Sequence, residues 1–290
     1  MTDLCIAGLP IQVESADHEF FDRRFAAYRR NDDRPAVMTM RTVRTDCIIE
    51  PNGETVQKIN SATVVRLDDG RLARYTRVND RSPIPFLFIY TPDYADVEIY
   101  LWKERKTDAL TLTDWEYVYT GTMFQNRLAM FGGGVLHSSA IAFRGTGIAF
   151  SADPGVGKST HVGLWKERFD DDVTIINDDK PAIIFRDGKP QLCGTPWSGK
   201  TALNTNTDIT LNAIVFLEQG NSNAIRRLNP VEAMYQLIGQ VLRPYYDEGL
   251  GEKMVDFAQR LLEQCPIYML TCTPTQKAVD AVYRTIFPQG

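Results

Sequence analysis

Short apolar runs separated by turn residues fill the first 110 residues of the chain. The runs are rich in β-branched and aromatic residues, a pattern that predicts β-strands. One stretch differs, because over residues 17–28 large apolar side chains recur at helical spacing. Its apolar stripe consists of Phe20, Phe21, Phe25 and Tyr28. The strands expected in this part cover residues 36–40, 47–50, 62–67, 71–75, 86–90 and 97–102.

A longer helix is expected over residues 113–131, with Thr113 and Glu116 in capping-box positions, before three consecutive glycines. Beyond the glycines, apolar runs alternate with helical segments, and tight hairpins are expected over 138–151 and 182–193. We therefore expect a mixed α/β chain. A mainly antiparallel β-rich domain covers 1–110, a connecting helix covers 111–134, and a domain with a mixed sheet covers 135–290.

Residues 152–159 read Ala-Asp-Pro-Gly-Val-Gly-Lys-Ser, which matches the phosphate-binding pattern G-x-x-x-x-G-K-[S/T] except at its first position. An expected strand precedes this run and an expected helix follows it, which is the context that such a loop requires. Gly155 and Gly157 let successive N–H groups turn toward phosphate oxygens. Lys158 supplies a charge for the β- and γ-phosphates, and Ser159 supplies a hydroxyl for Mg²⁺.

Two adjacent acids, Asp178 and Asp179, follow the apolar run 173–177. Ligands of open α/β sheets bind outside strand ends of this kind. One carboxylate can hold Mg²⁺, and the other can accept the proton of an attacking hydroxyl. The pair therefore predicts the second half of a phosphoryl-transfer site.

Two further segments are candidates for the site. A lone histidine at the start of a strand is more often structural, but the strand that His137 begins lies beside the one that leads into the loop, which makes His137 a candidate. Residues 193–200 combine two Gly with Pro, Trp and Lys, and constrained loops of this kind often border a site. Trp197 is a candidate pocket wall, and Lys200 is a candidate contact for phosphate or an acidic acceptor. A structural turn with a solvated Lys explains this segment equally well.

Composition excludes several classes of protein. Of the 290 residues, 43% are hydrophobic and 24% are charged, which is usual for globular proteins. The net charge of −5 gives no indication of binding to nucleic acid or to a membrane surface. No apolar run is long enough to span a bilayer, and the first residues do not resemble a signal peptide. The five cysteines are scattered without metal-type spacing, which favours reduced thiols and a cytoplasmic protein.

Three blocks together resemble the HPr kinase/phosphorylase family: His-Ser-Ser-Ala at 137–140, the loop at 152–159 and the acid pair at 178–179. The same blocks are similar in order and spacing to the ATP-dependent phosphoenolpyruvate carboxykinases, which share that nucleotide-binding fold. The resemblance covers about residues 135–287. Ala152, Pro154 and Thr160 depart from the pattern of the HPr kinases, which points to a relative that acts on another acceptor.

The resemblance implies Mg²⁺-dependent phosphoryl transfer from ATP. It implies that Asp178 is the general base and that Ser159 and Asp179 hold the metal, although the two acids can exchange roles. His137 lies near the γ-phosphate or a second cation, and Lys158 acts on the transferred group. The residues implied to hold the nucleotide are Asp153, Pro154, Gly155, Val156, Gly157, Lys158, Ser159 and Thr160.

The sequence therefore predicts a kinase whose acceptor is a hydroxyl of a peptide, a protein serine or a small molecule. ATP and GTP remain open as donors, because no base-reading motif is visible, and the resemblance also allows a homo-oligomer. Two alternatives remain. A non-catalytic nucleotide-binding regulatory module would bind nucleotide without forming product, and a phosphorylase or lyase would act on a phosphorylated molecule.

Overall fold

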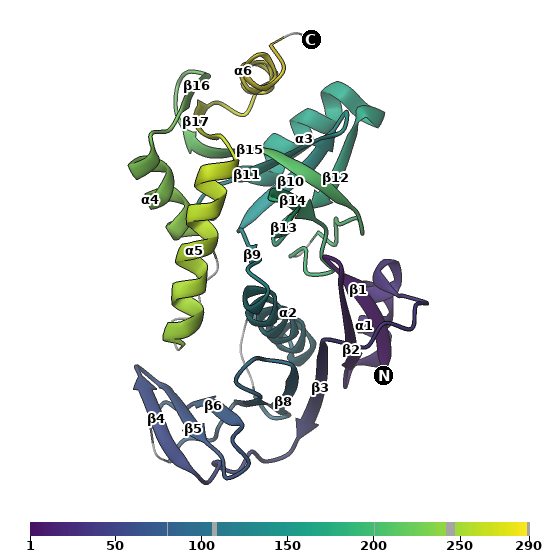
Figure 1. Cartoon of the computed structure of the whole chain (residues 1–290), viewed down its shortest axis with the longest axis vertical. Helices are drawn as coiled ribbons and strands as arrows, with labels where there is room; N and C mark the ends of the chain where they lie inside the picture. The colour runs from purple at the N-terminus through teal and green to yellow at the C-terminus, as the bar shows by residue number, and fades with distance from the viewer. Residues whose placement is uncertain (80, 106–108, 200, 242–246, 289–290) are drawn as a thin grey trace. The chain divides into compact units, whose positions relative to one another are not determined.

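The computed structural model of the chain describes residues 1–79, 81–105, 109–199, 201–241 and 247–288 (Figure 1). The chain divides into two compact units. One is Met1–Phe131 with Pro244–Leu250, and the other is Gly132–Arg243 with Gly251–Gly290. Each unit has a mixed sheet and helices, which confirms the expected mixed α/β class.

An eight-stranded sheet forms most of the N-terminal unit, in the order β1-β2-β3-β8-β7-β6-β5-β4. Neighbouring strands are antiparallel, except that β2 pairs with β3, and β3 with β8, in parallel. A short helix, α1 (His18–Phe25), with a 3-10 turn (Ala26–Tyr28) lies between β2 and β3 in the chain. The strands are β1 (Thr2–Ile6), β2 (Leu9–Glu14), β3 (Met38–Thr45), β4 (Glu54–Ile59), β5 (Ala62–Arg66), β6 (Leu72–Thr76), β7 (Phe86–Tyr90) and β8 (Asp96–Trp102).

The strand expected over residues 47–50 is wrong, because these residues form no regular structure. Glu50 instead accepts side-chain hydrogen bonds from Tyr75, at 2.5 Å, and Arg77, at 2.8 Å. A carboxylate that binds Tyr75 of β6 and Arg77 just after that strand holds this segment in place without a ladder of backbone bonds.

Helix α2 (Leu112–Met130) packs against β3 and β8. The expected capping box at Thr113 and Glu116 is wrong, because the box forms at Thr111 and Asp114. The Asp114 N–H donates to Thr111 Oγ1 at 3.1 Å, and the Thr111 N–H donates to Asp114 Oδ2 at 2.8 Å. The helix therefore begins one residue earlier, and the side chains of Thr113 and Glu116 are free to bind other parts of the unit.

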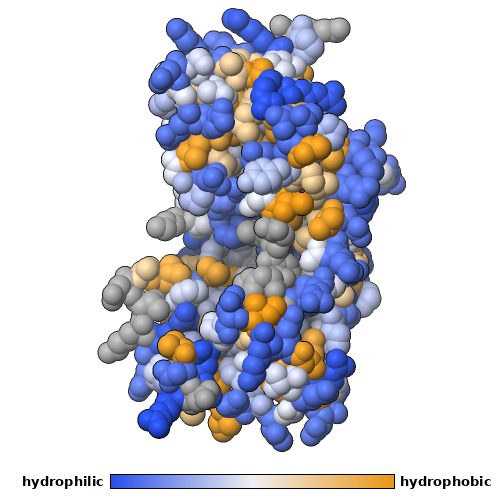
Figure 2. Space-filling view, turned by 90° about the vertical axis from the view of Figure 1, so that its left-hand side faces the viewer, coloured by the Kyte–Doolittle hydropathy of each residue, from blue (hydrophilic) through white to orange (hydrophobic). Residues whose placement is uncertain are grey.

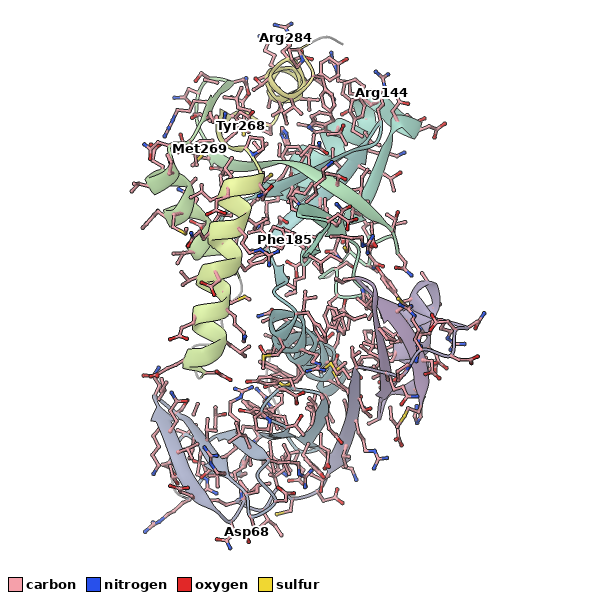
Figure 3. All side chains as sticks on the ribbon, viewed as in Figure 1. Asp68, Arg144, Phe185, Tyr268, Met269 and Arg284 are labelled. Atoms are coloured by element: carbon pink, nitrogen blue, oxygen red, sulfur yellow. The ribbon has the colours of Figure 1, made fainter. Side chains whose placement is uncertain are left out.

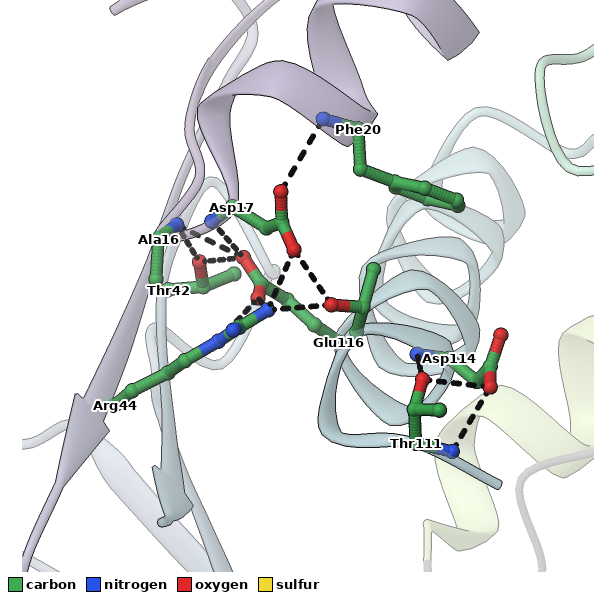
Figure 4. Close-up of polar contacts among 9 residues, drawn as sticks. Ala16, Asp17, Phe20, Thr42, Arg44, Thr111, Asp114 and Glu116 are labelled. Atoms are coloured by element: carbon green, nitrogen blue, oxygen red, sulfur yellow. Dashed lines mark hydrogen bonds and ion pairs between the residues drawn. The ribbon is translucent and has the colours of Figure 1, made fainter. Parts of the chain in front are cut away.

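Glu116 binds α2 to the sheet and to the start of α1 (Figure 4). Its carboxylate is fully buried and accepts from the Ala16 N–H at 2.8 Å, from Thr42 Oγ1 and from both Nε and Nη2 of Arg44, at 3.1 and 2.8 Å. Arg44 also donates to Asp17 at 3.2 Å. A buried charge is tolerated when its lone pairs are satisfied in this way.

We expect Glu116→Gln to lower the free energy of unfolding by at least about 2 kcal/mol, because the neutral amide loses charge-assisted bonds and leaves Arg44 less well paired. Urea unfolding followed by circular dichroism measures the change. The matched control is Glu19→Gln, since the Glu19–Arg23 pair is exposed, and surface pairs contribute about 0–1 kcal/mol. Equal effects of both substitutions would contradict the structural role of Glu116.

The second unit contains a nine-stranded mixed sheet. Its main path is β12-β10-β11-β15-β14-β13-β9, and β17 pairs with β15 and β16 beside this path. The strands are β9 (Gly134–Val135), β10 (Ser138–Phe143), β11 (Thr146–Ser151), β12 (Val173–Asn177), β13 (Ala182–Arg186), β14 (Lys189–Cys193), β15 (Asp208–Gln219), β16 (Ala224–Arg227) and β17 (Ile267–Cys272). The helices are α3 (Lys158–Phe169), followed by a 3-10 turn (Asp170–Asp172), α4 (Pro230–Gln240), α5 (Glu248–Gln264) and α6 (Gln276–Ile286).

The core of this unit lies between the sheet and helices α3 and α6. It is built from buried apolar residues of β10, β11, β15 and both helices, including Phe143, Phe150 and Trp165, which are fully buried. Arg168 and Asp280 join the two helices by an ion pair of 2.6 Å. On α5, Phe257 packs edge-on against Phe185 of β13, which Figure 3 labels. These contacts hold the central strands rigidly enough to position loops at their ends.

On the face that Figure 2 shows, hydrophilic residues predominate and hydrophobic ones form small separate groups. All five cysteines are free thiols. Among the described helices, none has the length and apolar character needed to cross a lipid bilayer.

Candidate functional site

Three strands bring the candidate residues to one edge of the sheet. β10 runs antiparallel to both β11 and β12, so the ends of β11 and β12 lie beside the start of β10. Ser138 pairs with Ser151, and Ala140 pairs with Asn177. The loop that follows β11, the acids that follow β12 and the histidine that precedes β10 therefore meet at this edge.

The loop after β11 adopts a conformation that depends on two glycines. Gly155 and Gly157 have φ values of +83° and +117°, in the left-handed region where side chains are strained. Gly157 is also the N-cap of α3, which carries no side-chain cap. The first N–H groups of α3 are therefore available to an anion.

Ala152 occupies the first position of the loop, where the phosphate-binding pattern has Gly. It is 4% exposed and belongs to the apolar core, and its φ is not positive. Alanine therefore fits there without strain, and its methyl group adds to the core. The departure from the pattern does not alter the two positions at which the backbone requires glycine.

The side chain of Lys158, at the end of the loop, contacts the backbone at the start of the loop. Its ammonium donates to the carbonyl oxygen of Ala152 at 2.8 Å. Burial lowers the pKa of Lys158, while the charges of Asp179, Asp153 and Asp178 act in the opposite direction. The same interactions show that this ammonium lies within electrostatic reach of all three carboxylates.

Asp178 is held by hydroxyl groups from two sides. Ser139 Oγ donates to its Oδ1 at 2.6 Å, and Thr201 Oγ1 donates to its Oδ2 at 3.1 Å. Ser139 is fully buried, whereas Thr201 is exposed. Asp178 as a whole residue is 8% exposed. One oxygen is therefore bound by a buried hydroxyl, and the other by the hydroxyl of an exposed residue.

Asp179 is surrounded by positive and polar groups. His137 Nε2 lies 3.4 Å from its Oδ1, and Lys180 Nζ forms an ion pair with its Oδ2. Burial raises the pKa of Asp179, but the hydrogen bond from His137 and the charge of Lys180 outweigh it and bring the pKa to about 2. A Cβ at Gly199 would lie 3.1 Å from the Cβ of Asp179, so a glycine gives this side chain its space.

Gln240, the last residue of α4, connects His137 with the loop. Its Nε2 donates to Asp153 Oδ1 at 2.7 Å, and its Oε1 lies 3.1 Å from His137 Nδ1. Its carbonyl oxygen also accepts from the His137 N–H at 3.0 Å. Because an ionised carboxylate can only accept, the amide is oriented by Asp153, so His137 Nδ1 donates to Gln240 Oε1, and the hydrogen bond to Asp179 requires a second proton on His137 Nε2. His137 Nε2 is thereby directed at Asp179.

The remaining candidates lie in different environments. Ser159 and Thr160 are exposed in the first turn of α3, and Asp153 and Pro154 are exposed in the loop. Trp197 is 3% exposed, and its carbonyl oxygen lies 3.5 Å from Asn177 Nδ2. Lys200 lies outside the described residues. Within the described ranges, no three His, Cys, Asp or Glu side chains form a group suited to a metal ion.

Four polar residues of this edge were not predicted as candidates from the sequence: Ser139, Lys180, Thr201 and Gln240. Lys180 and Thr201 directly follow the candidates Asp179 and Lys200, and Ser139 lies two residues after His137, so proximity in the sequence could have indicated them. Gln240 is 103 residues from His137, and nothing in the pattern of α4 distinguishes it from the other polar positions of the helix. Only the fold brings it to the site.

Comparisons with known proteins give limited information. No family model and no curated protein matches the chain. Among solved structures, it is similar to the Hpr(Ser) kinase/phosphatase from Coxiella burnetii, at 8% identity and a TM-score of 0.33. The likeness covers 52% of this chain and 94% of that chain. A TM-score this low supports no conclusion about function, which is therefore argued from the residues of this chain.

We expect Gly157→Ala to lower the affinity for a nucleoside triphosphate at least about tenfold, because the side chain is strained at φ +117° and turns the N–H groups of the loop away. Isothermal titration calorimetry measures the affinity. Gly163→Ala is the control. Gly163 lies inside α3, where an added Cβ meets no atom within 4 Å, and we expect it to keep the affinity and gain about 1 kcal/mol of stability. Equal affinity of both variants would contradict a phosphate-binding role for the loop.

Proposed function

We propose that this protein is a Mg²⁺-dependent kinase that transfers the γ-phosphoryl group of ATP to a hydroxyl of a peptide, a protein serine or a small molecule. The observation that supports it most is the meeting of the Lys158 loop with Asp178 and Asp179 at one sheet edge. The resemblance of three sequence blocks to the HPr kinase/phosphorylase family supports the same reaction. The departures at Ala152, Pro154 and Thr160 favour an acceptor other than HPr.

Asp178 is the proposed general base. Its Oδ1 is fixed by the buried Ser139, while its Oδ2 accepts from the exposed Thr201. An acceptor hydroxyl that replaces Thr201 on Oδ2 donates its proton to the carboxylate as its oxygen bonds to the γ-phosphorus. The bond from phosphorus to the bridging oxygen breaks, and ADP leaves.

The donor phosphates are assigned to the loop and to the start of α3. The N–H groups there bind phosphate oxygens, and Lys158 supplies a positive charge that offsets the charge on the transferred group. Ser159 and Asp179 are the residues that would hold Mg²⁺, because a hydroxyl and an ionised carboxylate are oxygen donors of the kind this cation prefers. The bound cation would supply charge neutralisation to the β- and γ-phosphates.

His137 and Gln240 are assigned positioning roles. Gln240 fixes the ring of His137 and the loop residue Asp153 through one amide. The ring in turn is directed at Asp179, so the loop and the acid pair are held in a common geometry. Preorganisation of this kind is what positions donor and acceptor for transfer.

We expect Asp178→Asn to abolish phosphoryl transfer and to keep nucleotide affinity within about twofold, because the amide cannot accept the proton while the loop is unchanged. The assay follows transfer from γ-labelled ATP with Mg²⁺ across a panel of peptide, protein and small-molecule acceptors. Asp187→Asn is the matched control, since Asp187 lies in the exposed turn between β13 and β14 with φ +51°, which Asn accepts.

The outcomes separate the candidate functions. Transfer by Asp178→Asn at the rate of the unaltered protein would disprove the assignment of the base. Tight nucleotide binding without product for any acceptor would indicate a regulatory module instead of a kinase. Lys158→Ala tests whether the transfer takes place at this site. A labelled product that this variant forms as fast as the unaltered protein does not come from this site.

We expect Gln240→Leu to lower kcat about 10- to 100-fold with a smaller change in the KM for nucleotide, because the substitution keeps the volume and removes both side-chain hydrogen bonds. Gln259→Leu on α5 is the control, since the Gln259 side chain bonds only to Glu263 in the described structure. An unchanged kcat in Gln240→Leu would show that the connection between His137 and Asp153 has no part in transfer.

A further inference from the structure

A hydroxyl of the chain itself lies on the acid that the proposed function uses as a base. Thr201 Oγ1 is 3.1 Å from Asp178 Oδ2 and 3.3 Å from the carbonyl oxygen of Ser198. A hydroxyl has one proton to donate, and a carboxylate accepts it more strongly than a carbonyl does. The proton of Thr201 is therefore directed at Asp178, which is the contact that a general base makes with the hydroxyl it activates.

The two hydroxyls bound to Asp178 differ in their access to a ligand. Ser139 donates to Oδ1 at 2.6 Å from a fully buried position on β10. Thr201 donates to the other oxygen and is an exposed residue. Of these two hydroxyls, only that of Thr201 combines contact with the carboxylate and access from outside the protein.

The loop that carries Thr201 is attached to the strand that carries the acid. The Asp178 N–H donates to the Leu203 carbonyl at 3.1 Å, and the Thr205 N–H donates to the Ile176 carbonyl, also at 3.1 Å. Both bonds join the segment just after Thr201 to the end of β12. The fold therefore holds the hydroxyl and the carboxylate together through the backbone as well as through their own hydrogen bond.

The turn around Thr201 has an unusual backbone. Gly199 and Ala202 have φ values of +66° and +54°, and alanine is strained in this region. Asn204 Nδ2 donates to Ser198 Oγ at 2.8 Å, which joins the two sides of the turn. Strain of this kind persists where the surrounding contacts specify the conformation, and it is concentrated at functional sites. The position of Thr201 is therefore a specified feature of the fold.

The same acid is close to the residue assigned to the donor phosphates. The charges of Asp178 and Asp179 both act on the Lys158 ammonium. On the proposed function, Lys158 binds the phosphoryl group that is transferred. Asp178 therefore has the phosphate-binding lysine within electrostatic reach and the Thr201 hydroxyl in direct contact.

We propose that Thr201 is a phosphorylation site that the protein modifies on itself, by transfer within the same chain. This inference rests on the proposed function and adds an acceptor to it. Thr201 Oγ1 bonds to the γ-phosphorus of ATP, and its proton passes to Asp178 Oδ2. The bond from that phosphorus to the bridging oxygen breaks, and ADP leaves with its electron pair.

The product changes the charge at the site. A phosphothreonine carries a charge of about −1.5 to −2 at pH 7. Asp178 and Asp179 repel this group, so the modified turn moves away from the acid pair. The hydroxyl has been consumed, and each chain therefore accepts a single phosphoryl group at this position.

The first test incubates the full chain with γ-labelled ATP and Mg²⁺ without an added acceptor, and maps the label by peptide mass spectrometry. We expect a single phosphoryl group per chain, on Thr201. We expect the rate per chain to stay within about twofold over a roughly hundredfold dilution, because transfer within one chain needs no encounter between molecules. Lys158→Ala protein that is mixed with the unaltered protein should remain unlabelled.

The second test changes the hydroxyl. We expect Thr201→Val, which keeps the volume, to lower labelling of the chain at least about 100-fold, and Thr201→Ser to be labelled at the same position. Thr205→Val is the matched control on the same loop. The Thr205 hydroxyl donates to the Ile175 carbonyl at 2.9 Å and not to an acid, so we expect this variant to keep the labelling within about threefold.

The outcomes distinguish this inference from the proposed function. Transfer to an added acceptor without label on Thr201 would overturn the inference and leave the proposed kinase in place. Labelling of Thr201→Val at the rate of the unaltered protein would also overturn it, as would label on the Lys158→Ala chain in the mixture. Absence of label on the chain and on every acceptor would overturn both the inference and the proposed function.

Discussion

The antiparallel position of β10 between β11 and β12 is the constraint on which the candidate site depends. Because β10 reverses direction relative to both neighbours, its first residues lie where β11 and β12 end. The backbone contact between these segments continues beyond the end of β12, since the Ser138 N–H donates to the Asp179 carbonyl at 3.2 Å. At the far end of the same strands, Arg144 in the hairpin turn pairs with Asp172 before β12 at 2.6 Å (Figure 3).

Hydrogen bonds between side chains then fix the positions of the candidate residues at the ends of these strands. Ser139 holds one oxygen of Asp178, and Gln240 holds both His137 and Asp153. Ser139 and Asp178 are both buried, where an unsatisfied polar group would be costly, so their hydrogen bond fixes the carboxylate as well as stabilising it. The second unit therefore orders the acid pair through hydrogen bonds, in the same way that Glu116 orders α2 in the first unit.

The sequence predicted the elements whose signals are local. The hairpin of β10 and β11 follows from Arg144-Gly145, which both have positive φ, and the start of α4 follows from Asn229 and Glu232, which form a capping box. The strands β1, β2 and β4 were missed, since polar residues interrupt their apolar pattern and pairing with neighbours defines them. Gln240 could not be predicted for the same reason, because its role comes from a contact across 103 residues.

The charge around the loop limits what the site can bind. Asp153, Asp178 and Asp179 converge near Lys158, and Lys180 and His137 already contact Asp179. A bound triphosphate adds further negative charge beside three carboxylates, and the loop supplies one lysine and the N-terminus of α3 to offset it. The dipole of α3 places about half an elementary positive charge at this N-terminus. On the proposed function, the balance favours a divalent cation that accompanies the nucleotide, because Asp179 would help to hold the cation and its charge would offset the repulsion between the phosphates and the carboxylates.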